Sequence, residues 1–241
     1  MKISTSWRSE RLGQEVAVAR WGEVGTPVLL FPTAGGDAEE IERFLMIDAL
    51  DDLLTAKRIK VYSVDSIAGR TLLQQDGTPS HRSHIQNQFH SFIYNEVVPA
   101  IRTDCADPDI EVIAAGTSIG AFNALAVLCR FPDVFTTAIC LSGTYDLLKW
   151  VDDEMSEDFY NSSPLHFLEG MAGDHLDLLR TRFVLLASGQ GDWEDIGESW
   201  RAANALGAKG IPNRMDPWGA EWHHNWQTWR AMLPQYLDEL A

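Results

Sequence analysis

Residues 111–130, EVIAAGTSIGAFNALAVLCR, form the stretch from which the fold of this chain can be read. The stretch opens with an apolar run at residues 112–115, which is typical of a buried strand. A short turn, GTSIG, follows at residues 116–120 with Ser118 at its centre. From residue 122 onward, apolar side chains recur at helical spacing. The pattern predicts a strand, a tight turn and a helix in direct succession.

The turn has the composition of one that presents a serine hydroxyl for chemistry. Ser118 is predicted to take a strained backbone conformation at the carboxyl end of the strand, which exposes its hydroxyl above the sheet. Gly116 and Gly120 fit this geometry, because a side chain at either position would collide with the neighbouring strand or helix. The N–H group of Ile119, at the start of the helix, would point toward an oxyanion formed at the serine. In this strand–turn–helix the chain resembles the nucleophile elbow of the α/β-hydrolase superfamily.

Strands and helices alternate through the rest of the chain. Two antiparallel strands are expected within residues 3–21, around a turn at residues 11–14. Further strands are predicted at residues 26–32, 60–66, 136–142, 182–188 and 210–217, and helices at about 37–54, 84–102, 198–206 and 226–240. This alternation predicts an α/β fold, here the α/β-hydrolase fold, with a mostly parallel central sheet and helices on both faces. We expect a single domain over residues 1–241, with its ligand at the carboxyl ends of the strands.

Residues 144–178 interrupt this alternation with an acidic, aromatic and irregular stretch. We interpret the stretch as a small cap insertion above the site; a surface insertion with its own small core is the alternative. Trp150 and Tyr160 within it, and Trp218 near the end of the chain, are the candidate substrate-binding side chains.

The overall composition limits the kinds of partner. The 241 residues carry a formal charge of −16, which disfavours binding to nucleic acid or to anionic membranes. No apolar run approaches the roughly 18 residues that would span a membrane, and the N-terminal residues lack a signal-peptide core, so we expect a cytoplasmic protein. The three cysteines, Cys105, Cys129 and Cys140, are expected to be buried reduced thiols.

A serine hydroxyl needs a neighbouring base, and that base needs an acid to orient it. In α/β-hydrolases the three residues follow the chain in the order serine, acid, histidine. Of the seven histidines, only His223 and His224 follow the last predicted strand, in the loop before the closing helix. The base is therefore expected to be one of these two.

The tail of the chain, PWGAEWHHNWQTWRAMLPQYL, is similar to the end of the "putative esterase" family, the esterase D or antigen-85-type branch. In that family the catalytic histidine directly precedes an Asp/Asn-Trp pair, which fits His224 followed by Asn225 and Trp226, although the family more often has Asp where Asn225 stands. The similarity extends to the strand PVLLFP with its Gly-rich turn, to the GTSIG turn and to the strand end LSG. The resemblance implies that His224 is the base and leaves His223 as a loop residue or an outer hydrogen-bond donor.

The acid should follow the strand at residues 182–188, where the loop GQGDWED offers Asp192, Glu194 and Asp195. Relatives that resemble this chain have Gly-x-x-Asp or Gly-x-x-Glu after the strand, and GQGD matches that spacing, so Asp192 is the first candidate. Glu194 is the second, because the loop is one residue longer than in those relatives. Asp146, just past the preceding strand, is the third.

The second oxyanion donor should come from the loop after the strand at residues 26–32. The small residues TAGG at positions 33–36 let backbone N–H groups approach a ligand closely. Ala34 is the first choice, with Thr33 or Gly35 as neighbours in register.

His81 and His84 stand three residues apart in a polar loop, a spacing that can bind a metal. Neither a cysteine nor a carboxylate at matching spacing accompanies them, so we expect no metal and no cofactor.

Together the residues and the family resemblance imply a serine-dependent hydrolase that cleaves small-molecule carboxylic esters through an acyl-enzyme on Ser118, with His224 as base and Asp192 as orienting acid. Two alternatives are kept: an acyltransferase with the same triad, as in the antigen-85-type relatives, and a non-catalytic hydrolase-fold protein that binds a ligand. The acyl group, the alcohol and the existence of a homo-oligomer are left open.

Overall fold

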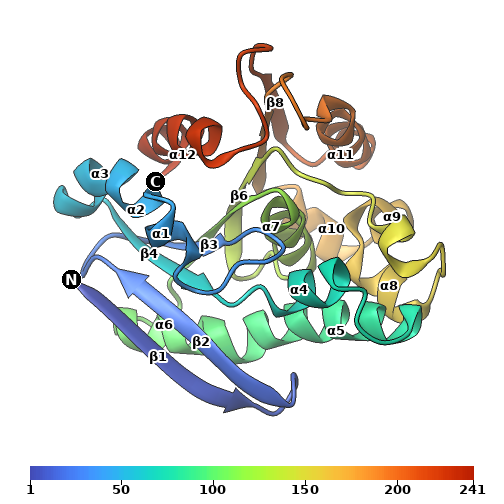
Figure 1. The fold of residues 1–241 in the computed structure, drawn as a ribbon, viewed down its shortest axis with the longest axis horizontal. Coiled ribbons are helices and arrows are strands. Elements are labelled where there is room, and N and C mark those ends of the chain that lie inside the picture. Colours follow the sequence, from blue (N-terminus) through green and yellow to red (C-terminus); the bar gives the residue numbers. More distant parts are fainter.

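A mixed sheet of eight strands runs through the computed structural model, which describes all residues from Met1 to Ala241 (Figure 1). The strands lie side by side in the order β1-β2-β4-β3-β5-β6-β7-β8. Their bounds are β1 Lys2–Ser9, β2 Gln14–Trp21, β3 Thr26–Phe31, β4 Ile59–Val64, β5 Val112–Thr117, β6 Phe135–Leu141, β7 Phe183–Ser188 and β8 Asn213–Pro217. β1 and β2 are antiparallel to their neighbours, and all other pairs are parallel. The prediction of a mostly parallel α/β sheet preceded by two antiparallel strands is confirmed.

The helices fill the connections between the strands. They are α1 Glu40–Arg43, α2 Met46–Ala49, α3 Asp51–Thr55, α4 Ile67–Leu73, α5 Pro79–Phe92, the π-helix η1 Ile93–Val97, α6 Val98–Cys105, α7 Ile119–Arg130, the 3-10 helix η2 Leu148–Val151, α8 Glu157–Ser162, α9 Pro164–Gly170, α10 Asp174–Leu179, α11 Ile196–Ala208 and α12 Trp226–Leu240. None of them combines the length and the apolar character needed to cross a bilayer.

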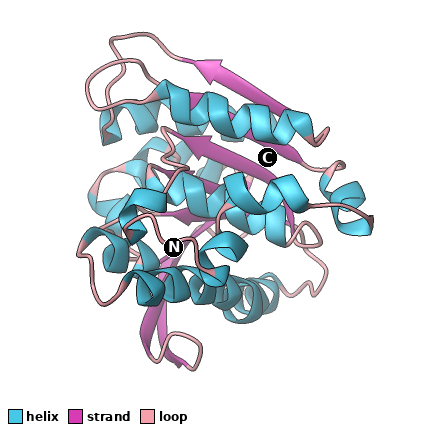
Figure 2. Cartoon of the chain, turned by 90° about the vertical axis from the view of Figure 1, so that its right-hand side faces the viewer, coloured by secondary structure: helices cyan, strands magenta, loops and turns pink.

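Two hydrophobic clusters, one on each face, hold the helices to the sheet. Side chains of α5, α7 and α11 pack on one face, against Leu29 and Phe31 of β3. Side chains of α1–α3 and α12 pack on the other face, against Val28 and Leu30 of the same strand. Figure 1 shows α12 with α1–α3 on one side and α5 with α6 on the other, and Figure 2 shows the helices packed along the strands. Because successive side chains of a strand point to opposite faces, β3 needs its continuous apolar run to serve both layers.

The predicted helix over residues 37–54 is wrong in one respect, since it is divided into α1, α2 and α3. Leu45 has a φ of 61°, a left-handed conformation that an α-helix does not tolerate. The preceding Phe44 stacks on Trp226, with ring centroids 5.1 Å apart, and its carbonyl accepts a hydrogen bond from Arg230 (2.7 Å). Contacts with α12 therefore accompany the break that the sequence pattern misses.

The predicted helix over residues 84–102 is longer in the structure and contains a π-turn. It runs through α5, η1 and α6 from Pro79 to Cys105. Pro99 is the second residue of α6, which directly follows the π-helix, and it has no N–H group to donate to the preceding turn. A local widening to π geometry accommodates such a residue within a continuous helix.

Residues 144–178 carry η2, α8, α9 and α10 and pack beside α5, α7 and α11. Arg82 on α5 donates to Asp152 (2.6 Å), and Asn87 on the same helix donates to Asp158 (2.6 Å). Three apolar side chains of the segment lie in one cluster with Ile119 and Phe122 of α7: Leu147, Val151 and Phe159. The segment thus shares its apolar contacts with the helix that follows Ser118.

Candidate active site

Ser118 lies between β5 and α7 in a sharp turn with φ 57° and ψ −122°. Such a conformation is strained for a residue with a side chain, and it persists only where the surrounding structure enforces it. The N–H group of Ser118 donates to the carbonyl of Leu141 at the end of β6 (3.0 Å), which fixes the turn to the neighbouring strand. The side chain is therefore presented at the carboxyl edge of the sheet, as the sequence motif predicts.

Gly116 and Gly120 allow this turn to close. A Cβ atom on Gly116 would overlap the carbonyl group of Gly120, and a Cβ atom on Gly120 would overlap the carbonyl oxygens of Phe31 and Pro32. Helix α7 can approach β3 and β5 this closely only because both positions lack a side chain.

His224 lies in the loop between β8 and α12, and its Nδ1 atom is 3.3 Å from Oε2 of Glu194. The carboxylate of Glu194 is 1% exposed. It accepts hydrogen bonds from the hydroxyl groups of Ser142 (2.6 Å) and Ser188 (3.3 Å). Trp229 of α12 donates to the Ser142 hydroxyl (3.0 Å), so this hydroxyl links α12 to the carboxylate. The buried carboxylate is thus surrounded by donors, which compensates for the cost of removing its charge from water.

This arrangement favours one tautomer of the neutral imidazole. An ionised carboxylate accepts hydrogen bonds only, so the Nδ1 atom that faces Glu194 carries the proton. The Nε2 atom of His224 then has a free lone pair and can accept a proton from an alcohol. The side chain of His224 is 22% exposed, so the ring is also open to solvent.

The structure does not bring the carboxylate of Asp192, the first candidate for the acid, to the imidazole of His224. The Asp192 side chain is 84% exposed, and its nearest imidazole is that of His223, with Oδ2 3.6 Å from Nδ1. The intervening Trp193 has a φ of 67°. This left-handed turn reverses the direction of the chain, so that Asp192 faces solvent and Glu194 faces the interior. Asp146, the third candidate, pairs with Arg201 (3.1 Å).

Ser118 and the pair of Glu194 and His224 lie at one edge of the sheet because of the strand register. Thr117 of β5 pairs with Leu141 of β6, so that Ser118 and Ser142 are the next residues of two neighbouring parallel strands. Ser142 binds Glu194, and Glu194 faces His224. A series of neighbouring residues therefore leads from the elbow to the imidazole along the carboxyl ends of the strands.

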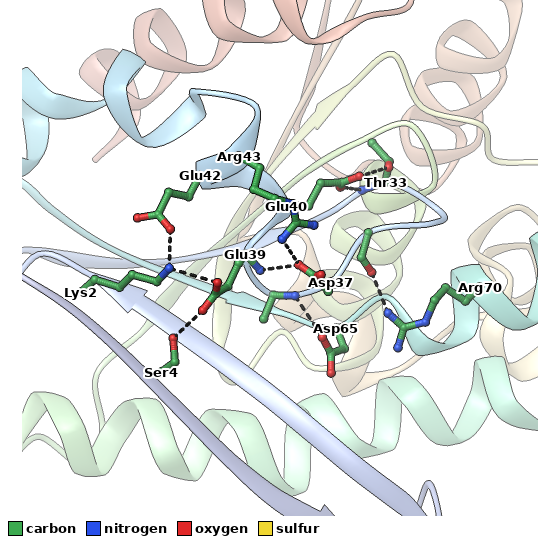
Figure 3. Close-up of polar contacts among 12 residues, drawn as sticks. Lys2, Ser4, Thr33, Asp37, Glu39, Glu40, Glu42, Arg43, Asp65 and Arg70 are labelled. Carbon is green, nitrogen blue, oxygen red and sulfur yellow. Dashed lines mark hydrogen bonds and ion pairs between the residues drawn. The ribbon is translucent and has the colours of Figure 1, made fainter.

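The loop after β3 is held rigidly by polar contacts (Figure 3). The N–H group of Thr33 donates to Oε2 of Glu40 (2.8 Å), and the hydroxyl of Thr33 donates to Oε1 (2.7 Å). Further along the loop, Asp65 accepts from the N–H group of Ala38 (3.0 Å) and Arg70 donates to the carbonyl of Gly36 (3.0 Å). The Thr33 amide is therefore engaged, although the sequence offered it as an oxyanion donor.

The adjacent Ala34 has no acceptor for its amide within the protein. Its side chain packs in the cluster that contains Ile119. Gly69 of α4 lies against it, since a Cβ atom there would be 2.9 Å from both the Cα and the carbonyl oxygen of Ala34. The first N–H groups of a helix lack partners within that helix, which leaves the amide of Ile119 available as well. The structure thus places Ala34 and Ile119 together beside the elbow.

The three predicted aromatic contacts lie in different surroundings. Trp150 packs against the cluster of Ile119, and its carbonyl accepts from Arg82 (3.1 Å). Tyr160 is 39% exposed and its hydroxyl group lies beside Gly170. Trp218 points toward α12, where its indole N–H donates to the hydroxyl of Tyr236 (2.8 Å). Of the three, Trp150 shares a cluster with the elbow.

Three side chains of the site are absent from the sequence-based candidates: Ser142, Ser188 and Trp229. Ser142 directly follows β6 and Ser188 ends β7. Polar residues at the carboxyl ends of parallel strands are a signal for a site at that edge, and this signal would have found both serines. His223 accepts a hydrogen bond from the Asp192 amide (2.8 Å), so its contact is with the loop that carries the acid.

The comparisons with known proteins identify a family and a shared fold. The model of the family described as "Putative esterase" matches residues 56–239. No curated protein sequence matches the chain significantly.

Solved structures with the same fold include several enzymes of low sequence identity. A ferulic acid esterase superposes with a TM-score of 0.76 at 16% identity, covering 98% of this chain and 95% of that one. An S-formylglutathione hydrolase from Agrobacterium tumefaciens gives 0.77 at 14% identity, covering 99% and 94%. The fluorophosphonate-binding serine hydrolase F of Staphylococcus aureus gives 0.66 at 14% identity, covering 99% and 97%. Since the family model matches well over half of the sequence, the chain belongs to the putative esterase family, has the α/β-hydrolase fold and is a carboxylesterase-type hydrolase.

Proposed function

We propose that the protein hydrolyses carboxylic esters of small molecules through an acyl-enzyme on Ser118, with His224 as the base and Glu194 as the acid that orients it. The buried contact between Glu194 and Nδ1 of His224 (3.3 Å) is the observation that carries this proposal. Glu194 takes the place of Asp192, the first choice from the sequence, because Asp192 faces His223 and solvent.

In the first half of the reaction, Oγ of Ser118 attacks the ester carbonyl carbon while Nε2 of His224 takes the hydroxyl proton. The tetrahedral oxyanion accepts hydrogen bonds from the N–H groups of Ile119 and Ala34. Glu194 stabilises the imidazolium cation through Nδ1. The intermediate collapses when the C–O bond to the alcohol breaks, and the alcohol leaves with the proton from Nε2.

In the second half, water replaces the alcohol. Nε2 of His224 takes a proton from water as its oxygen attacks the acyl carbon, and the same two amides hold the second oxyanion. Collapse then breaks the bond to Oγ, Ser118 regains its proton and the carboxylic acid is released. The partial exposure of His224 supports access by water.

The apolar cluster beside the elbow supplies a wall for the substrate. Leu148 and Trp150 of the segment 144–178 pack around Ile119 and Ala34. We propose that Trp150 contacts the substrate beside the oxyanion donors, and that the segment 144–178 forms one side of the site rather than a separate surface insertion.

The experiment measures hydrolysis of p-nitrophenyl acetate and p-nitrophenyl butyrate by the wild type and by Ser118→Ala. We expect kcat to fall on the order of 10⁴-fold or more, because the members of a triad act as a unit. A fluorophosphonate probe should label the wild type on Ser118 and leave Ser118→Ala unlabelled, and Ser6→Ala, at an exposed serine of β1, is the matched control. Equal hydrolysis rates in wild type and Ser118→Ala would refute the proposal.

A further inference from the structure

The loop that carries the acid and the loop that carries the base are joined by hydrogen bonds along their length. The acid loop spans residues 189–195 and the base loop residues 218–225. Gln190 donates from its backbone to Gly219 (3.2 Å) and from its side chain to Trp218 (2.8 Å). Further on, Gly191 donates to the carbonyl of Trp222 (2.9 Å). The two loops therefore behave as one unit, although they follow different strands.

Asp192 is held on both sides by the two adjacent histidines. Its N–H group donates to Nδ1 of His223 (2.8 Å), and its carbonyl accepts from the N–H group of His224 (3.0 Å). Within the residues of the base loop, His223 is the one whose side chain makes a hydrogen bond to the backbone of the acid loop. Glu194, the proposed acid, follows two residues later.

The two loops approach each other so closely that neither glycine of the acid loop could carry a side chain without a clash. A Cβ atom on Gly191 would overlap Nδ1 of His223 and would lie 2.8 Å from the carbonyl oxygen of Trp222. A Cβ atom on Gly189 would overlap the same carbonyl oxygen. The imidazole of His223 thus lies directly against the backbone of the acid loop, while 43% of its side chain stays exposed to solvent.

The backbone immediately after Asp192 needs such support. Trp193 has a φ of 67° while its side chain is 92% exposed, so its side chain contributes little packing to hold this left-handed turn. The turn nevertheless decides that the carboxylate of Glu194 reaches the interior. Two hydrogen bonds from the base loop hold Asp192 directly before this turn, one from its amide to Nδ1 of His223 and one from the His224 amide to its carbonyl.

We propose that His223 is a positioning residue for the catalytic acid. Its Nδ1 atom accepts the Asp192 amide, fixes the backbone before the turn at Trp193 and so keeps the carboxylate of Glu194 against Nδ1 of His224. This inference rests on the proposed function, and it assigns a role to an imidazole that does not contact the reacting atoms.

The test compares His223→Leu with His223→Asn. Asparagine can present its Oδ1 atom close to the position of Nδ1 and accept the same amide, whereas leucine fills space without an acceptor. We expect His223→Leu to lower kcat for p-nitrophenyl butyrate by about 10- to 100-fold with KM within about twofold, because a small displacement of a catalytic group costs rate. His223→Asn should keep kcat within about threefold of the wild type. His81→Leu, at an exposed histidine near the start of α5, is the control and should leave kcat unchanged.

Hydrogen exchange supplies a readout independent of turnover. The Asp192 amide, followed in a peptide covering residues 189–195, should exchange faster in His223→Leu than in the wild type and should stay protected in His223→Asn. Wild-type kcat in His223→Leu would overturn the inference, and so would equal losses of kcat in the Leu and Asn variants. Failure of the proposed function looks different, because the wild type itself would then be inert and would not react with a fluorophosphonate.

Discussion

The carboxylate of Glu194 lies 3.3 Å from Nδ1 of His224 and is almost completely buried, whereas the carboxylate of Asp192, two residues earlier, is in solvent. Buried hydroxyl groups from two strand ends, Ser142 and Ser188, hold the Glu194 carboxylate in place. The carboxylate that meets His224 is therefore selected by the direction of a loop, and the spacing from the preceding glycine does not decide it.

Replacement of each carboxylate in turn tests this selection. Glu194→Gln keeps the shape of the side chain but removes the charge that stabilises the imidazolium, and we expect kcat to fall on the order of 10³- to 10⁴-fold. Asp192→Asn and Asp146→Asn change exposed or half-exposed groups and should leave kcat within about twofold. The measurement is p-nitrophenyl butyrate hydrolysis by the three variants. A larger loss of kcat in Asp192→Asn than in Glu194→Gln would identify Asp192 as the acid instead.

Alanine should affect the free energy of unfolding differently at a glycine of the elbow and at a glycine within an open helix. Gly120→Ala forces a Cβ atom into the carbonyl groups of Phe31 and Pro32, and we expect a loss of about 1–3 kcal/mol or more in the free energy of unfolding. Gly207→Ala is the matched control, because this glycine lies within α11 with no atom near its Cβ position. That variant should gain about 0.5–1 kcal/mol, as alanine is favoured over glycine in a helix. Urea unfolding measures both, and equal effects would contradict the packing argument.

The contacts of Glu40 with the loop after β3 lead us to expect that its removal lowers the rate of hydrolysis. Its carboxylate binds both the amide and the hydroxyl of Thr33, next to the proposed donor Ala34. Glu40→Ala should release this loop and lower kcat by about 10-fold, because the loss of these two hydrogen bonds misplaces the proposed donor Ala34. Glu39→Ala removes a neighbouring, partly exposed carboxylate that binds Lys2 and Ser4 instead, and kcat should be unchanged. Similar kcat values in the two variants would show that the Thr33 contacts do not matter for the reaction.

The buried histidine on α5 predicts a pH dependence of stability. His90 is fully buried, its Nε2 atom lies 3.0 Å from Oδ1 of Asn123, and Arg130 contacts its Nδ1 atom (3.1 Å). Burial, and then the charge of Arg130, lowers the pKa of His90 from 6.5 to about 3. Between these two values the unfolded chain binds a proton that the folded protein does not, so stability is complete above about pH 6.5 and declines as the pH falls toward 3.

A neutral variant isolates this contribution. Between pH 7 and pH 5 the wild type should lose about 2 kcal/mol more than His90→Gln in the free energy of unfolding, since one pKa unit corresponds to about 1.4 kcal/mol. The comparison of the two pH slopes removes the contributions of other groups. Parallel slopes in wild type and variant would mean that His90 is protonated in the folded protein.

Product analysis separates hydrolysis from acyl transfer. With His224 partly exposed, water reaches the base, and we expect p-nitrophenyl butyrate to yield butyric acid as the main product even when an alcohol is added. Mass spectrometry of the products measures the ratio of acid to new ester. Predominance of the new ester at low alcohol concentration would instead favour the acyltransferase.

The fold could be predicted from the sequence because its signals are local. The apolar run of β3 and the strand–turn–helix around Ser118 each lie within about 20 consecutive residues, and their periodicity is visible without knowledge of any contact. The division of the predicted helix at residues 37–54 could not be seen in this way. It coincides with the contacts of Phe44 with Trp226 and Arg230, residues almost 200 positions away in α12.

The sequence by itself determined the sheet, the elbow with its two glycines and the position of His223 and His224 after the last strand, because each depends on residue types at fixed local spacing. Tertiary structure alone decided which carboxylate meets the imidazole and which backbone amide is free beside the elbow. Glu194 is buried because the left-handed turn at Trp193 directs it toward Ser142 and Ser188, which the strand register brings to one edge. The amide of Thr33 is engaged by Glu40, seven residues later, and only the folded loop shows that this contact leaves Ala34 available.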